Sequence, residues 1–199
     1  MPDLPRADNL EYDEFWNREY AEKIEESREQ IKHMERAMEI IRANKSAGIK
    51  NSYDLEIFSS IVRLVDHTCS TYLALSELEL AIKEAHSQRF RSHEAALGAL
   101  KQAVIIIDNN LRDREKVYGE LVAIWELTRL PKGMSTDEKE FFHRQDRARH
   151  FAFRRADMSY LICDEEFLGL EDYREKLIEY IEYYKSLYFQ EEAPTLAGT

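Results

Sequence analysis

The residues whose types and spacing could most clearly bind a ligand or take part in a reaction lie on one predicted helical stretch in the C-terminal third of the chain. Four basic or titratable side chains there are spaced four, three and four residues apart, so they share one helix face: His143, Arg147, His150 and Arg154. This basic strip could bind a carboxylate, phosphate or sulfate through charge-assisted hydrogen bonds. The sequence favours the alternative that the strip pairs with an acidic helix of the same chain. The N-terminal helical stretch offers five such partners: Glu25, Glu26, Glu29, Glu35 and Glu39.

The same stretch contains half of a metal-binding signature. Glu140 and His143 form a Glu-x-x-His pair, which ferritin-like di-iron proteins carry twice, together with two more inward-facing carboxylates. None of the other histidines has a glutamate three residues before it. A lone pair of this kind arises by chance in a glutamate-rich chain. We therefore expect no metal site and no other cofactor.

The sequence contains no motif typical of nucleophilic or acid–base catalysis. The chain has neither a Gly-x-Ser-x-Gly elbow nor a glycine-rich phosphate loop, and it contains only six glycines. The acidic pairs Asp137-Glu138 and Asp164-Glu165 lie at predicted helix starts, where carboxylates interact favourably with the helix dipole. We interpret them as capping residues and expect no catalytic residue in this chain.

An aromatic run and two isolated polar residues complete the candidates. The run lies near the C-terminus and comprises Tyr180, Tyr183, Tyr184, Tyr188 and Phe189. Exposed aromatic rings stack on carbohydrates and anchor protein interfaces. Tyrosines at helical spacing more often pack in a core with the hydroxyl at its edge, and this is the interpretation we favour. His67 and Arg114 lie on otherwise apolar stripes, so we expect each to be a buried polar group with satisfied hydrogen bonds, or a residue that fixes the register of its helix, and not a catalytic residue.

The elements that carry these residues are all predicted to be α-helices. No proline occurs between residues 9 and 130, and helix-favouring residues dominate this stretch. Apolar residues recur three and four apart over residues 9–45, 52–87 and 92–130, which predicts three helices, each about 50 Å long at 1.5 Å per residue. Short loops make them antiparallel neighbours.

Beyond the turn at Pro131 and Gly133, a shorter C-terminal helical pair is predicted, with a capped start at Ser135 and a last helix over about 168–189. The predicted fold is therefore an all-α antiparallel bundle of three long helices plus this pair. We expect one domain over residues 1–190, with loose ends at 1–8 and 190–199.

The charge of the chain excludes several classes of partner. Its net charge is −11, from 39 acidic and 28 basic side chains. Non-specific nucleic-acid binding and docking on anionic lipid both require positive charge, so we expect neither. No apolar run reaches eighteen residues, and the first thirty residues lack the pattern of a signal peptide. These features leave the compartment open, with the cytoplasm favoured.

The stretch from Trp125 to Gly133 has a residue order that helix periodicity does not require: Trp-Glu-Leu-Thr-Arg-Leu-Pro-Lys-Gly. It is followed at residues 150–160 by His-Phe-Ala-Phe-Arg-Arg-Ala-Asp-Met-Ser-Tyr. Together the two motifs resemble the helical region after the catalytic barrel of bacterial β-N-acetylhexosaminidase-type proteins, in or near glycoside hydrolase family 20. The resemblance covers about residues 95–185, half of the chain.

This resemblance implies a non-catalytic helical module of a carbohydrate-active glycoside hydrolase-like protein. In that family an Asp-Glu pair on a barrel strand orients the substrate acetamide and supplies the acid. The present chain has no run of strands to build a barrel, so no catalytic residue carries over. The matching residues are expected to hold helix junctions together: Trp125, Glu126, Arg129, Lys132, Arg154, Arg155 and Asp157.

Any ligand site is expected beside this junction, where it would combine the motif with the basic strip. Its candidate residues are Trp125, Glu126, Arg129, His143, Arg147, His150 and Arg154. The resemblance implies a catalytic barrel domain or a carbohydrate as partner. The alternative function is a freestanding helical-bundle interaction module that binds an acidic partner or self-associates as a homo-oligomer.

Overall fold

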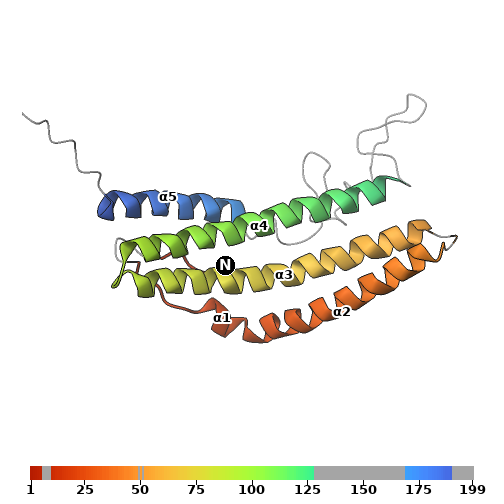
Figure 1. Ribbon diagram of the computed structural model, residues 1–199, viewed down its shortest axis with the longest axis horizontal. Helices are drawn as coiled ribbons and strands as arrows, with labels where there is room; N and C mark the ends of the chain where they lie inside the picture. The colour runs from red at the N-terminus through yellow and green to blue at the C-terminus, as the bar shows by residue number, and fades with distance from the viewer. Residues whose placement is uncertain (6–9, 49, 51, 128–168, 190–199) are drawn as a thin grey trace, which may run out of the picture. The chain divides into compact units, whose positions relative to one another are not determined.

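The computed structural model describes residues 1–5, 10–48, 50, 52–127 and 169–189, and every helix or strand in these ranges is an α-helix (Figure 1). The helices are α1 (Trp16–Glu19), α2 (Ala21–Ser46), α3 (Ser52–Gln88), α4 (His93–Glu126) and α5 (Leu170–Tyr188). The all-α prediction, with three long helices and a shorter C-terminal one, is confirmed. The helix predicted to begin at Ser135 lies outside the described residues.

The described residues pack as two compact units. Unit 1 comprises residues 1–5, 10–28, 69–112 and 169–189, and unit 2 comprises residues 29–48, 50, 52–68 and 113–127. The three long helices each contribute residues to both units. The expectation of one domain over residues 1–190 stays a prediction.

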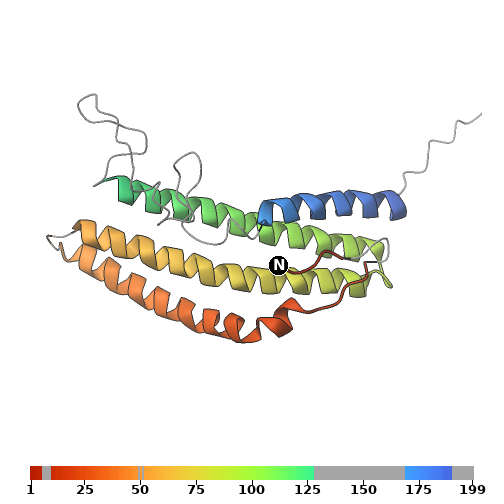
Figure 2. The same ribbon diagram turned by 180° about the vertical axis from the view of Figure 1, so that it is seen from behind.

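Unit 1 has a core built from helix faces with three- and four-residue spacing. In both views α5 lies along the first half of α4 (Figures 1 and 2). Leu170, Leu177 and Ile181 form the buried face of α5. The facing helices contribute Leu75, Leu78 and Ile82 from α3 and Leu97, Leu100 and Ile107 from α4. Burial of these stripes stabilises the unit, because apolar surface leaves water.

Unit 2 joins the end of α2, the start of α3 and the end of α4 at one place. Lys45 pairs with Glu56 at 2.7 Å, and the hydroxyl of Tyr53 donates to the carbonyl oxygen of Ile124 at 3.4 Å. The turn between α2 and α3 contains Gly48 at φ 69°, the left-handed conformation expected after a helix end. These contacts link the end of α2 to the start of α3, and the start of α3 to the end of α4.

The predicted helix boundaries agree with the structure at most ends and fail at one. Ser92 accepts a hydrogen bond from the amide of Ala95 at 3.2 Å, as expected of the cap of α4. The first helix was predicted to begin at residue 9, and this is wrong, because residues 10–15 are irregular and α1 ends before a break at Tyr20. A distant side chain of α3 binds the amides of this segment, as described below.

The core of unit 1 allows a direct test with two leucines of α3. Leu78 is fully buried, whereas Leu80 is 50% exposed. Leu78→Ala should lower the free energy of unfolding by about 2–5 kcal/mol, because it leaves a cavity among packed side chains. Leu80→Ala is the matched control and should change it by less than about 0.5 kcal/mol in urea unfolding. Equal effects of the two substitutions would contradict this assignment of the core.

Candidate functional site

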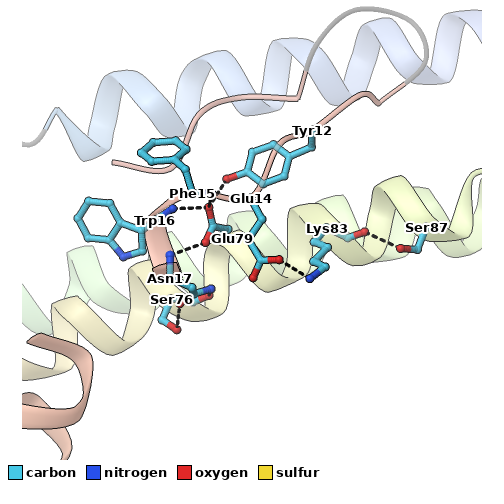
Figure 3. A network of polar contacts seen from close by, with 9 residues as sticks. All are labelled: Tyr12, Glu14, Phe15, Trp16, Asn17, Ser76, Glu79, Lys83 and Ser87. Carbon is cyan, nitrogen blue, oxygen red and sulfur yellow. Dashed lines mark hydrogen bonds and ion pairs between the residues drawn. The ribbon is translucent and has the colours of Figure 1, made fainter. Parts of the chain in front are cut away.

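A fully buried carboxylate on α3, Glu79, is the first candidate for chemistry (Figure 3). Its Oε1 accepts hydrogen bonds from the hydroxyl of Tyr12 at 2.7 Å and from the amides of Phe15 at 2.9 Å and Trp16 at 2.8 Å. Its Oε2 accepts from the amide of Asn17 at 2.6 Å. All four donors lie in residues 10–17, which we call the N-terminal segment, so this one side chain holds that segment on α3.

The environment of Glu79 keeps it ionised. Burial alone would raise its pKa, but the donated bonds from the Asn17, Phe15 and Trp16 amides and from Tyr12 outweigh burial and lower the pKa. Burial, followed by the contact with this carboxylate, raises the pKa of Tyr12. A carboxylate whose oxygens accept four bonds is poorly suited to proton transfer, so Glu79 has a structural role.

Further polar contacts hold the rest of the N-terminal segment and the residues before it. The Nδ1 of His86 lies 2.6 Å from the carbonyl oxygen of Leu10, and Leu10 is fully buried. The hydroxyl of Tyr173 on α5 donates to the carbonyl oxygen of Asp3 at 3.3 Å. The side-chain amide of Asn17 donates to the carbonyl oxygen of Ser76 at 3.2 Å. The segment is thus part of unit 1.

Unit 2 contains the second candidate, a groove of about 560 Å³ lined by α2, α3 and α4. Its apolar lining consists of Met34, Met38, Val62 and Val117, and methionines adapt to differently shaped occupants. Charged side chains of both signs complete the lining: Glu35, Glu39, Arg42, Arg63, Asp66, Asp113 and Lys116. This combination suits a polypeptide segment with an apolar face and charged flanks.

One part of the groove is locally acidic. The pKa of Asp66 is raised, first by burial and then by the neighbouring carboxylates of Asp113 and Glu35. A carboxylate oxygen of Asp113 also lies within hydrogen-bond distance of the Nδ1 of His67, at 2.7 Å. His67 is 1% exposed, and its ring meets that of Tyr118 edge-on at 6.2 Å. The expectation that His67 is buried is therefore confirmed, and its Nδ1 has a hydrogen-bond partner.

The third candidate is an aromatic patch at the end of unit 1 where the α3–α4 loop meets the end of α5. We define it as His93 and Tyr188, whose rings are in contact, together with the exposed Phe90, three residues before His93, and the exposed Phe189, next to Tyr188. The rings of His93 and Tyr188 stack at 4.0 Å with an interplanar angle of 13°. The Nδ1 of His93 lies 2.7 Å from the hydroxyl of Tyr184, and the guanidinium of Arg89 lies 4.3 Å from the centre of the Phe90 ring.

The exposure of the aromatic side chains near the C-terminus agrees with the prediction for one residue and differs from it for three. Tyr184 is 1% exposed, as expected of a core residue. Tyr183, Tyr188 and Phe189 are exposed, so the core interpretation is wrong for these three. Tyr188 and Phe189 follow Tyr184, the last buried residue of α5, whereas Tyr183 lies on the exposed face of the helix between Ile181 and Tyr184. Helical spacing alone does not reveal where burial ends.

Most of the site residues predicted from the sequence fall outside the described part of the chain. Trp125 and Glu126 are the last two residues of α4, but their side chains are not described. The remaining candidates lie outside the described residues: Arg129, His143, Arg147, His150 and Arg154. Arg114 is half-buried on α4.

Sequence reasoning missed Glu79, although the sequence contained a signal for it. Leu75 and Ile82 are seven residues apart on the apolar stripe of α3, and Glu79 occupies the gap between them. A charged residue on such a stripe indicates a buried group with specific partners.

Within the described ranges, no group of three or more His, Cys, Asp or Glu side chains is arranged to hold a metal ion. None of the helices in this part of the chain is both long enough and apolar enough to cross a bilayer. Glu140 and His143 lie outside these ranges.

The role of Glu79 predicts a specific pH dependence. Glu79→Gln should lower the free energy of unfolding at neutral pH by about 1.5–3 kcal/mol, the range for hydrogen bonds to a charged group. Because its pKa is lowered in the folded state, Glu79 stabilises the fold above the ordinary glutamate pKa of about 4.3 and loses this effect as pH falls through the lowered value. Urea unfolding from pH 7 to pH 3 should show the difference between wild type and variant shrinking.

Glu77→Gln provides the matched control, because Glu77 is exposed two residues away on the same helix. Trypsin cleavage after the exposed Arg18 should accelerate in Glu79→Gln and not in Glu77→Gln. A pH-independent difference, or equal behaviour of the two variants, would show that the carboxylate does not hold the segment.

Comparisons of the chain with protein-family models, with curated proteins and with solved structures found no match. The resemblance to the helical region of glycoside hydrolase family 20-like proteins therefore stays a prediction from two sequence motifs.

Proposed function

We propose that this chain is a non-catalytic helical module of a carbohydrate-active, glycoside hydrolase-like protein, and that it binds carbohydrate through the aromatic patch of unit 1. The exposed aromatic patch is the single observation that carries this proposal. Aromatic rings present an apolar face on which the C–H groups of a sugar can stack, and polar neighbours can bond to its hydroxyls.

The patch is held in place by contacts within unit 1. Tyr184 is buried and lies within hydrogen-bond distance of His93, and His93 in turn stacks on Tyr188. Phe90 is 75% exposed, although Arg89 lies over its ring. Rings fixed before binding lose little conformational entropy when a ligand arrives, which favours their use as a binding surface.

The sequence motifs at residues 125–133 and 150–160 support the same proposal, because they resemble a helical region that follows a catalytic barrel. A module in that position would act on carbohydrate by binding it, while a catalytic barrel domain would carry out hydrolysis. The barrel itself is then a second partner of the module.

The proposal is tested by titrating the full chain with N-acetylglucosamine oligomers in isothermal calorimetry. Tyr188→Ala and Phe90→Ala should each weaken binding about tenfold, the loss typical of one aromatic anchor. Phe58→Ala is the matched control, because Phe58 is a 57% exposed aromatic residue of unit 2. Absence of binding, or equal losses in all three variants, would contradict the proposal, as would hydrolysis of a chromogenic N-acetylglucosaminide by the purified chain.

A second candidate function is self-association or binding of an acidic protein partner. It is favoured by the cationic flank of the patch, where Arg91 is exposed and Arg89 lies over Phe90. Aromatic and arginine side chains together are typical of interface centres.

This second function predicts a concentration-dependent mass in sedimentation equilibrium. Tyr188→Ala should shift the protein toward monomer, since it removes the ring that His93 supports, while Phe58→Ala should leave the mass unchanged. A strict monomer at every concentration would contradict self-association.

A further inference from the structure

Two arginines flank Phe90 at the edge of the aromatic patch, at positions 89 and 91. Within the ranges that the structure describes, neither Arg89 nor Arg91 forms an ion pair with a carboxylate. Arg28 and Arg36 of α2, by contrast, each pair with a glutamate of their own helix. In a chain whose net charge is −11, the two arginines therefore give the patch a locally cationic edge.

Arg89 lies close to the buried Tyr184 as well as to Phe90. Its guanidinium carbon is 4.3 Å from the centre of the Phe90 ring. Burial raises the pKa of the Tyr184 hydroxyl and the neighbouring Tyr188 raises it further, whereas the positive charge of Arg89 acts in the opposite direction. Such an effect is strongest at short range, so the guanidinium is near Tyr184. Because that hydroxyl lies 2.7 Å from the Nδ1 of His93, Arg89 belongs to the same surface as the stacked rings.

The donors of Arg89 are not occupied by the other residue that it contacts. Its Nη1 lies 3.0 Å from the Nδ1 of His86, but that same nitrogen lies 2.6 Å from the carbonyl oxygen of Leu10. A carbonyl oxygen can only accept, so the Nδ1 of His86 carries a proton and cannot accept a bond from Arg89. A guanidinium has five N–H donors. Those of Arg89 are therefore available to an anion.

The other charges near the patch do not cancel the arginines. Lys185 of α5 pairs with Glu182 at 2.5 Å, so this pair adds no net charge. Glu94 is exposed and follows His93 in the first turn of α4. Adjacent helical residues point about 100° apart, so Glu94 lies on a different face of α4 from His93. The charge that an occupant of the patch meets is therefore that of the two arginines.

Exposed rings beside a guanidinium favour one class of sugar. A ring face offers stacking to the C–H groups of any saccharide. The planar fork of an arginine matches a carboxylate or a sulfate, and a charge-assisted bond of this kind is about twice as strong as one between neutral groups. A saccharide with an anionic group uses both features of the surface, whereas a neutral saccharide uses mainly the rings.

We propose that the aromatic patch binds an acidic saccharide, whose sugar ring stacks on an exposed aromatic ring while its carboxylate or sulfate group binds the guanidinium of Arg89. Arg91 strengthens the attraction as a second, exposed cation. This inference rests on the carbohydrate-binding function proposed above and adds the charge of the ligand. Aromatic side chains bury about 150–250 Å² each, so the three exposed ones offer less than the roughly 800 Å² that each partner of a stable protein complex buries, and the patch suits a few sugar rings better than a protein.

Calorimetric titration of the full chain with three oligomers of equal length tests this proposal. One contains N-acetylglucosamine alone, one alternates N-acetylglucosamine with glucuronate, and one is N-acetylglucosamine bearing sulfate. At low salt, at least one charged oligomer should bind about tenfold more tightly than the neutral one, as a charged hydrogen bond allows. Arg89→Gln should abolish this preference and change the affinity for the neutral oligomer by less than about twofold. Arg112→Gln is the matched control and should leave all three affinities unchanged, because Arg112 is an exposed arginine of unit 1 that bonds to Asn109 on its own helix.

Equal affinity for the neutral and the charged oligomers would overturn this inference and leave the carbohydrate-binding function standing, whereas absence of binding by all three would contradict both. Equal losses for neutral and charged oligomers in Arg89→Gln would also overturn it, because Arg89 would then only support the rings. A glutamate peptide of the same charge should bind at least about tenfold more weakly than the tighter charged oligomer, since it lacks a sugar face to stack on the rings. Equally tight binding of this peptide would show that charge alone is recognised, as on an acidic protein, and would overturn the proposal.

Discussion

The buried carboxylate of Glu79 is the constraint on which the organisation of unit 1 depends. An ion removed from water is strongly unfavourable unless hydrogen-bond donors replace its hydration. The donors here are the hydroxyl of Tyr12 and the consecutive amides of residues 15–17. Amides at a helix start have no partner within the helix, so the carboxylate also satisfies the start of α1. Leu10 and Trp16 are buried in unit 1 as part of the same arrangement.

The long helices could be predicted because their signals are local. Apolar spacing, the cap at Ser92 and the left-handed Gly48 all act within a few residues, and the structure agrees with each. The start of the first helix could not be predicted in this way. It depends on Glu79, which is 62–67 residues away from the donors that it binds. The gap in the apolar stripe of α3 indicates a buried acid, but it does not identify its partners.

The candidate sites show the same division between local and distant information. Helical spacing correctly places Tyr184 in the core, whereas the exposure of Tyr188 depends on where α5 ends relative to His93. The groove of unit 2 combines residues of three helices, so no single stretch of sequence reveals it. The two surfaces also differ in chemistry: the patch offers ring faces, whereas the groove offers charges of both signs around an apolar lining.

The distance in sequence between Glu79 and its donors has a consequence for the order of events during synthesis. The segment leaves the ribosome before α3, and the residue that holds it follows 62–67 positions later. At 5–20 residues per second, the segment waits for roughly 3–13 s before its partner has been made. During that interval Leu10 and Trp16 lack the α3 surface against which they are later buried. The nascent chain therefore exposes apolar residues that the finished protein conceals until Glu79 and its helix have been made.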